Sequence, residues 1–208
     1  MAKRSKSSER WLKEHAADAY VKRAHKEGFR SRAAFKLEEL DAAERLLKPG
    51  MLIVDLGAAP GGWSQYAAKV LNGKGSVYAL DILPMDPIAG VEFIEGDFRE
   101  PGPLEALKTR LKGRAVDLVM SDMAPNMSGI DAVDQPRALD LAELALEFSE
   151  EMLRPGGVLL SKIFQGAGFD GFLKRVRGEF TQVRMKKPPA SRARSSEMYL
   201  LATGRRIL

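Results

Sequence analysis

The feature that most constrains the fold is one strand-turn-helix unit in the first third of the chain. An apolar run at residues 51–56 predicts a buried strand, and a pattern typical of a helix follows at residues 63–71. Between them lies a turn rich in glycine and proline, so that residues 55–63 read Asp-Leu-Gly-Ala-Ala-Pro-Gly-Gly-Trp. Backbone amides at the N-terminus of such a helix can bind a ligand. The unit therefore predicts an α/β fold with a small-molecule site at this turn.

The rest of the chain continues this alternation. Strands are predicted near residues 51–56, 76–81, 91–94, 115–121, 157–163, 180–186 and 197–203. Helices are predicted near residues 31–47, 63–71, 103–110, 135–153 and 169–178, with Pro155, Gly156 and Gly157 ending the fourth. Alternating strands and helices favour a mostly parallel sheet with helices on both faces. With 208 residues, 45% of them apolar, the chain is long enough for one such domain, expected at 31–208.

The turn differs from a dinucleotide fingerprint, because Gly57 is followed by Ala58, Ala59 and Pro60 rather than by the G-x-G-x-x-G spacing. A dinucleotide is the weaker interpretation, and a purely structural turn is a further alternative. The spacing D-x-G-x-x-P-G-G-W resembles the first motif of S-adenosylmethionine (SAM) methyltransferases, particularly the FtsJ-like ribose 2′-O-methyltransferases. The resemblance implies a Rossmann-like SAM-dependent methyltransferase fold with a seven-stranded, mostly parallel sheet. It also implies that the seventh strand lies antiparallel beside the fifth.

Aspartates at strand ends are candidate ligands for this cofactor, because ligands of open α/β sheets bind at the carboxyl ends of the strands. Asp81 can accept hydrogen bonds from the ribose, and the resemblance places Asp97 at the adenine amino group. Asp122 can face the methionine part and the transferred methyl group. Each could instead be a turn or helix-capping aspartate. The full set of expected cofactor-binding residues is Asp55, Gly57, Pro60, Gly61, Gly62, Trp63, Asp81, Asp97 and Asp122.

Two of these residues have alternative roles. Asp55 either braces the loop or approaches the amino group of SAM, and Trp63 either packs the loop or lines the cofactor pocket.

Methyl transfer to a ribose hydroxyl also requires a group that removes a proton. The chain has no cysteine, which excludes disulfides, thiolate-zinc sites and cysteine nucleophiles. Its two histidines, His15 and His25, lie in the polar N-terminal segment. Lys162, at the end of the strand predicted at 157–163, is the candidate base.

The candidate catalytic residues are Lys36, Asp122, Lys162 and Glu197, which match in order and context the K-D-K-E tetrad of the FtsJ-like family. Their contexts read S-R-A-A-F-K, S-D-M-A-P-N, S-K-I-F and S-R-A-R-S-S-E. Lys36 is expected to be the second cation that favours a neutral Lys162, since nearby positive charge disfavours an ammonium. The two carboxylates are expected to orient the lysines and the ribose. The alternative is that Lys36 and Glu197 are ordinary surface charges.

Basic residues gather in two segments. Residues 1–32 carry ten Lys and Arg against four Asp and Glu, so residues 1–30 are predicted to form a basic RNA-binding arm. Within the arm, Trp11, Tyr20 and Phe29 are candidates for stacking on unpaired bases. A second patch comprises Arg184, Lys186, Lys187, Arg192 and Arg194. Either segment could instead be a solvated face, but together with a SAM site they favour an RNA partner.

The length and basic arm most resemble bacterial members of the family that methylate a uridine ribose of 23S ribosomal RNA, with the large (50S) subunit as substrate. No metal site and no DNA partner are expected. The sequence shows neither an apolar run of the roughly 20 residues that a membrane span needs nor a signal peptide, which predicts a cytoplasmic protein.

Two rival functions are a base amino-methyltransferase and a non-catalytic RNA-binding factor in ribosome assembly. The first lacks support because residues 122–126 read D-M-A-P-N rather than Asn/Asp-Pro-Pro-aromatic. The second has no need for the tetrad.

Overall fold

The computed structural model describes residues 18–126, 128–193 and 195–207. Within these residues, one sheet is built from seven strands: β1 (Leu52–Leu56), β2 (Ser76–Asp81), β3 (Val91–Glu95), β4 (Val116–Ser121), β5 (Leu153–Phe164), β6 (Phe180–Lys186) and β7 (Glu197–Arg205). The helices are α2 (Ala19–Glu27), α3 (Ala33–Glu44), α4 (Gly62–Leu71), α5 (Pro101–Leu111), α6 (Asp131–Met152) and α7 (Phe169–Glu179). None of the helices in this described part is long and apolar enough to cross a membrane.

The strand order is β3-β2-β1-β4-β5-β7-β6. Strands β1 to β5 pair in parallel, whereas β7 is antiparallel to both β5 and β6. The predicted fold class and the position of the seventh strand are therefore confirmed. The order reverses direction between β1 and β4, which is the point where open α/β sheets bind their ligands. The glycine-rich turn follows β1 at this point.

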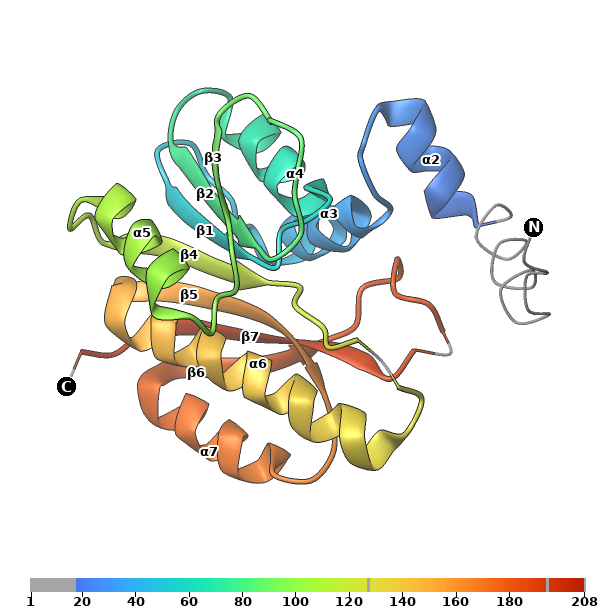
Figure 1. The fold of residues 1–208 in the computed structure, drawn as a ribbon, viewed down its shortest axis with the longest axis vertical. Helices are drawn as coiled ribbons and strands as arrows, with labels where there is room; N and C mark the ends of the chain where they lie inside the picture. Colours follow the sequence, from blue (N-terminus) through green and yellow to red (C-terminus); the bar gives the residue numbers. More distant parts are fainter. Residues whose placement is uncertain (1–17, 127, 194, 208) are drawn as a thin grey trace.

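The two faces of the sheet are covered by different helices (Figure 1). Alternate residues of a strand point to opposite faces. Along β1, Leu52, Val54 and Leu56 accordingly belong to the core beneath α5, α6 and α7, while Ile53 belongs to the core beneath α3 and α4. The buried apolar residues of both faces supply the main driving force for folding.

Helix α2 lies within the segment predicted as a basic arm. It packs on α3 through a small apolar cluster that includes Phe29 and Phe35, whose rings meet edge to face at 5.4 Å. The expectation that Phe29 stacks on RNA bases is wrong, because its side chain is only 8% exposed. The Tyr20 hydroxyl donates a hydrogen bond to Glu39 at 2.8 Å, while Trp11 and His15 lie outside the described residues.

The prediction was also wrong at the start of β5. The strand was expected to begin at Gly157, but it begins at Leu153 and includes Pro155 and Gly156, which were expected only to end a helix. Leu153 is buried and pairs with Val116, and the register between β4 and β5 then shifts before it resumes. The proline and glycines therefore form an irregularity inside the strand, a place that suits residues with unusual backbone angles.

Candidate active site

The glycine-rich turn is held by contacts that require glycine. Gly57 has φ +75° and donates its N–H to the Leu80 carbonyl at 2.9 Å. A Cβ placed on Gly57 would lie 2.5 Å from Cγ of Met123, so the loops after β1 and β4 touch here. Gly61 has φ +107° and caps α4. The turn thus brings its backbone to the carboxyl end of the sheet without side chains in the way.

The first residues of α4 pack on α3. A Cβ on Gly62 would lie 2.4 Å from Oγ of Ser31. Trp63 is only 2% exposed, and its Nε1 donates to the Ala33 carbonyl at 2.9 Å. Its ring also packs against Tyr199, with a centroid distance of 5.6 Å. Trp63 therefore ties the turn to α3.

Asp81 lies at the end of β2 and already binds two backbone amides. Its Oδ2 accepts from Ala59 N at 2.9 Å, and its Oδ1 accepts from Leu83 N at 2.8 Å. The carboxylate thereby links the glycine-rich turn to the segment that follows β2.

Asp97 lies in the loop after β3, where its carboxylate faces Arg99. Arg99 Nη2 lies 2.6 Å from Asp97 Oδ2. The hydrogen bonds from Arg99 lower the pKa of Asp97. Any ligand of Asp97 has to share the carboxylate with Arg99 or displace it.

Asp55 is fully buried at the end of β1. Its Oδ2 accepts a hydrogen bond from Ser64 Oγ at 2.6 Å, while its Oδ1 has no partner among the described residues. Burial raises the pKa of Asp55 to about 7; the charges of Asp122 and Asp81 act in the same direction, and the Ser64 hydrogen bond opposes them. A buried carboxylate with one unpaired oxygen is suited to a positively charged ligand group.

The four residues of the predicted tetrad meet at one place on the α3 side of the sheet. Lys36 from α3 lies with its Nζ 2.6 Å from Glu197 Oε1. The Lys162 Nζ lies 3.1 Å from Asp122 Oδ1 and donates to the Asp122 carbonyl at 2.6 Å. Lys36 is 8% exposed, so this ion pair stands at the border of the core rather than on the open surface.

Tyr199 joins these two pairs, and sequence reasoning did not identify it. Its hydroxyl donates to Asp122 Oδ1 at 2.8 Å and accepts from Lys36 Nζ at 3.1 Å. Tyr199 pairs with Lys162 across β5 and β7, so both side chains point to the same face. Glu197, two residues earlier in β7, shares that face. Because alternate residues of a strand share a face, the spacing of Glu197 and Tyr199 in the last strand could have indicated that Tyr199 belongs to the site.

Electrostatics keep the central carboxylate charged. Burial by itself would raise the pKa of Asp122, but the charges of Lys162 and Lys36 and the Tyr199 hydrogen bond outweigh it, so the net pKa is lowered. Burial and the Asp122 charge raise the pKa of Tyr199, so its phenol stays protonated and donates. The site is a connected chain of hydrogen bonds that contains two lysines and two carboxylates.

The second basic patch is partly neutralised from within the protein. Arg184 and Lys186 both pair with Glu44 of α3, at 2.7 and 2.5 Å. Arg192 lies 3.6 Å from Asp18, and Arg194 lies outside the described residues. The acidic partners are far away in sequence, so the linear charge run overstated the free positive charge. In α2, the side chains of Lys22, His25 and Lys26 are exposed.

Comparisons with known proteins identify a family and several proteins of similar structure. A profile of the FtsJ-like methyltransferases matches residues 29–205. A solved structure from Plasmodium falciparum, described as a ribosomal RNA methyltransferase, is 30% identical, with a TM-score of 0.77 over 85% of this chain and 98% of that chain.

Two more distant structures share the fold alone. A protein described as an rRNA-methylase from Clostridium thermocellum is 18% identical, with a TM-score of 0.54 over 81% of this chain and 97% of that one. A protein named as a hemolysin from Streptococcus thermophilus is also 18% identical, with a TM-score of 0.57 over 85% of this chain and 67% of that one.

The match covers both the glycine-rich turn and all four tetrad residues. This protein belongs to the FtsJ-like methyltransferase family, whose cofactor is S-adenosylmethionine.

Proposed function

We propose that this protein transfers a methyl group from SAM to the 2′-hydroxyl of a uridine in 23S ribosomal RNA within the large (50S) subunit. The observation that carries the proposal is the hydrogen-bonded chain Lys36-Tyr199-Asp122-Lys162, which lies beside the glycine-rich turn. The description of the Plasmodium falciparum relative supports ribosomal RNA as the substrate class. The resemblance of the tetrad to ribose methyltransferases supports the hydroxyl as the acceptor.

The residues at the carboxyl ends of the strands fit SAM. The unpaired buried Oδ1 of Asp55 is suited to the ammonium of the amino-acid part. Asp81 keeps lone pairs on both oxygens for the ribose hydroxyls, since each oxygen accepts one backbone amide. The exposed Ile82 and Leu83, next to Asp81, offer apolar surface to the adenine, with Asp97 at its amino group. Gly57, Pro60, Gly61, Gly62 and Trp63 form and support the backbone of the turn.

Bound SAM supplies a methyl group attached to a sulfonium, and that group is transferred to the ribose oxygen. Lys162 Nζ accepts the hydroxyl proton as general base, for which it must be neutral. Lys36 brings a second positive charge to the site, linked to Asp122 through the Tyr199 hydroxyl, and positive charge nearby favours a neutral amine. Asp122 fixes the direction of the Lys162 side chain. Glu197 holds Lys36 in place at 2.6 Å.

The RNA is proposed to approach from the side of α2. Exposed Lys22 and Lys26 lie on this helix, which packs against α3, the helix that carries Lys36. Basic side chains on such a surface attract the phosphate backbone by releasing condensed counterions. The rest of the predicted arm, residues 1–17, lies outside the described residues.

The proposed reaction is tested with isolated subunits. Labelled methyl groups from SAM should enter large subunits that lack the modification, and nucleoside analysis should find the label in 2′-O-methyluridine. Small subunits serve as the control and should stay unlabelled. Label on a base would contradict ribose methylation, and binding without label would contradict catalysis.

Loss of the proposed base should slow the chemistry without loss of binding. In Lys162→Ala, the single-turnover rate should fall by about 10²–10⁴-fold, the usual contribution of a general base. Lys162→Arg keeps a positive charge that cannot be removed at neutral pH, so it should be equally slow. Lys174→Ala, a change at an exposed lysine of α7, is the control and should have no effect. A fast Lys162→Arg variant would eliminate Lys162 as the base.

Binding of S-adenosylhomocysteine, which carries the same ammonium as SAM, should release a proton from Asp55. Because the pKa of Asp55 is raised to about 7, the carboxyl is mostly protonated at pH 6, and a bound cation stabilises its charged form. Calorimetry at pH 6 in buffers of different ionisation enthalpy should detect close to one released proton, and affinity should rise with pH up to about 7.

Asp55→Asn should abolish this proton release. Asp97→Asn is the matched control and should leave it unchanged, since the pKa of Asp97 is already lowered. Equal proton release by wild type and Asp55→Asn would show that another group titrates.

A further inference from the structure

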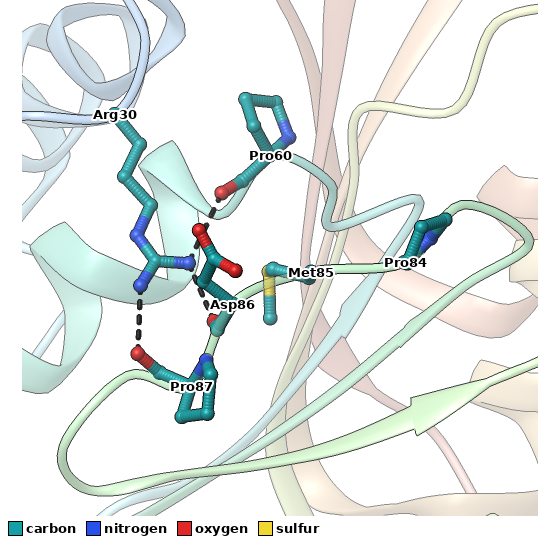
Figure 2. A pocket seen from close by; sticks show the side chains of 6 residues that line it. All are labelled: Arg30, Pro60, Pro84, Met85, Asp86 and Pro87. Carbon is teal, nitrogen blue, oxygen red and sulfur yellow. Dashed lines mark hydrogen bonds between the residues drawn. The ribbon is translucent and has the colours of Figure 1, made fainter.

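Arg30 binds two loops at the cofactor end of the sheet from outside. Its Nη1 donates to the carbonyls of Asp86 at 2.6 Å and Pro60 at 3.4 Å, and its Nη2 donates to the carbonyl of Pro87 at 2.7 Å. Figure 2 shows the guanidinium between these carbonyls. Pro60 belongs to the glycine-rich turn, whereas Asp86 and Pro87 belong to the segment between β2 and β3. One side chain therefore bonds to the backbone of both loops.

The backbone around Arg30 is fixed to α4. Arg30 N donates to Gln65 Oε1 at 3.0 Å, and Gln65 Nε2 donates back to the Gly28 carbonyl at 2.8 Å. The guanidinium is planar and its donors point in fixed directions. It can therefore bind several carbonyls at once only if the backbone of Arg30 is held in one place. The two hydrogen bonds of Gln65, to Arg30 N and to the Gly28 carbonyl, hold the backbone in this way.

The segment that Arg30 holds lies directly on Gly61. A Cβ on Gly61 would come within 2.6 Å of Ile88 Cδ1, 2.8 Å of Met85 Sδ and 3.3 Å of Arg30 Cδ. Gly61 caps α4 at the turn proposed to hold the cofactor. A displacement of residues 82–90 would therefore change the space around the turn.

Asp81 holds the same two loops from inside. Its two oxygens accept from Ala59 N in the glycine-rich turn and from Leu83 N in the segment after β2. Asp81 is also the proposed acceptor for the cofactor ribose. Arg30 and Asp81 thus restrain one pair of loops from opposite sides, and of the two only Asp81 is a proposed contact of the cofactor.

We propose that Arg30 is a positioning residue for SAM, which holds residues 82–90 against the glycine-rich turn in the geometry that binds the cofactor. This role rests on the use of SAM and not on the proposed RNA target. A basic residue beside the proposed RNA surface has a competing role as a contact for a phosphate. The hollow next to Arg30, of about 500 Å³, leaves the guanidinium accessible for that purpose. Its lining residues are Arg30, Pro60, Pro84, Met85, Asp86 and Pro87.

The experiment compares binding of S-adenosylhomocysteine without RNA in three variants. Arg30→Ala removes all three contacts. Arg30→Lys keeps the charge but donates from a single nitrogen, so it cannot bridge the carbonyls in the same way. Lys22→Ala removes one exposed charge from α2 and is the control. Melting temperature, large-subunit affinity and the KM and kcat for SAM are measured for each.

Arg30→Ala should weaken S-adenosylhomocysteine binding and raise the KM for SAM by about tenfold, the effect of losing charged hydrogen bonds. Its kcat at saturating SAM should match that of wild type, and Arg30→Lys should recover little of the lost affinity. Affinity for large subunits should fall no further than in Lys22→Ala.

Unchanged S-adenosylhomocysteine binding in Arg30→Ala would overturn the proposal, as would full recovery in Arg30→Lys. If Arg30→Ala does not fold, the proposal is tested by the S-adenosylhomocysteine affinity of Arg30→Lys alone. Because the cofactor analogue is measured without RNA, failure here leaves the proposed RNA target untouched, and a different RNA target leaves this role of Arg30 intact.

Discussion

The hydrogen bond and ion pair that meet on one oxygen of Asp122 hold the site together. Oδ1 of Asp122 accepts from the Tyr199 hydroxyl at 2.8 Å and lies 3.1 Å from Lys162 Nζ. Through Tyr199 the same oxygen is linked to Lys36, which comes from another layer of the molecule. Burying a lone charge is costly, so this carboxylate depends on its partners as much as they depend on it. Removing any member takes a hydrogen bond or an ion pair away from its buried or half-buried partners.

The sheet topology makes this arrangement possible. Asp122 follows β4, Lys162 lies in β5 and Tyr199 in β7, and these three strands are neighbours in the sheet. The antiparallel pairing of β7 places Tyr199 opposite Lys162, and Glu197 falls on the same face. Helix α3 covers that face through Leu37 and Leu40 in the core, which brings Lys36 of the same helix to the sheet. The burial of these apolar side chains therefore offsets the free energy needed to bring the charged groups together.

The sequence patterns were sufficient for the α/β class and for the polar residues at strand ends, because period-two and period-3.6 patterns and the glycine-rich turn are local signals. The roles of Lys36 and Glu197 and the antiparallel last strand were expected only from the resemblance to the FtsJ-like family. Contacts between segments that are distant in the chain could not be predicted from these local patterns. Tyr199 looked like one more apolar strand residue until its pairing with Lys162 was known. Arg184 and Lys186 looked free because Glu44 is far away in the chain. Phe29 looked available to RNA, yet it fills a gap between α2 and α3.

The measurement that tests the central role of the Asp122 carboxylate most directly is the single-turnover rate of methyl transfer in Asp122→Asn, with SAM and large subunits both saturating. The asparagine keeps the size of the side chain and removes the charge that orients Lys162. We expect the rate to fall at least about 100-fold while the melting temperature shows a folded protein. A folded variant whose rate stays within about threefold of wild type would contradict the proposed arrangement, since a charge on which catalysis depends contributes far more than that.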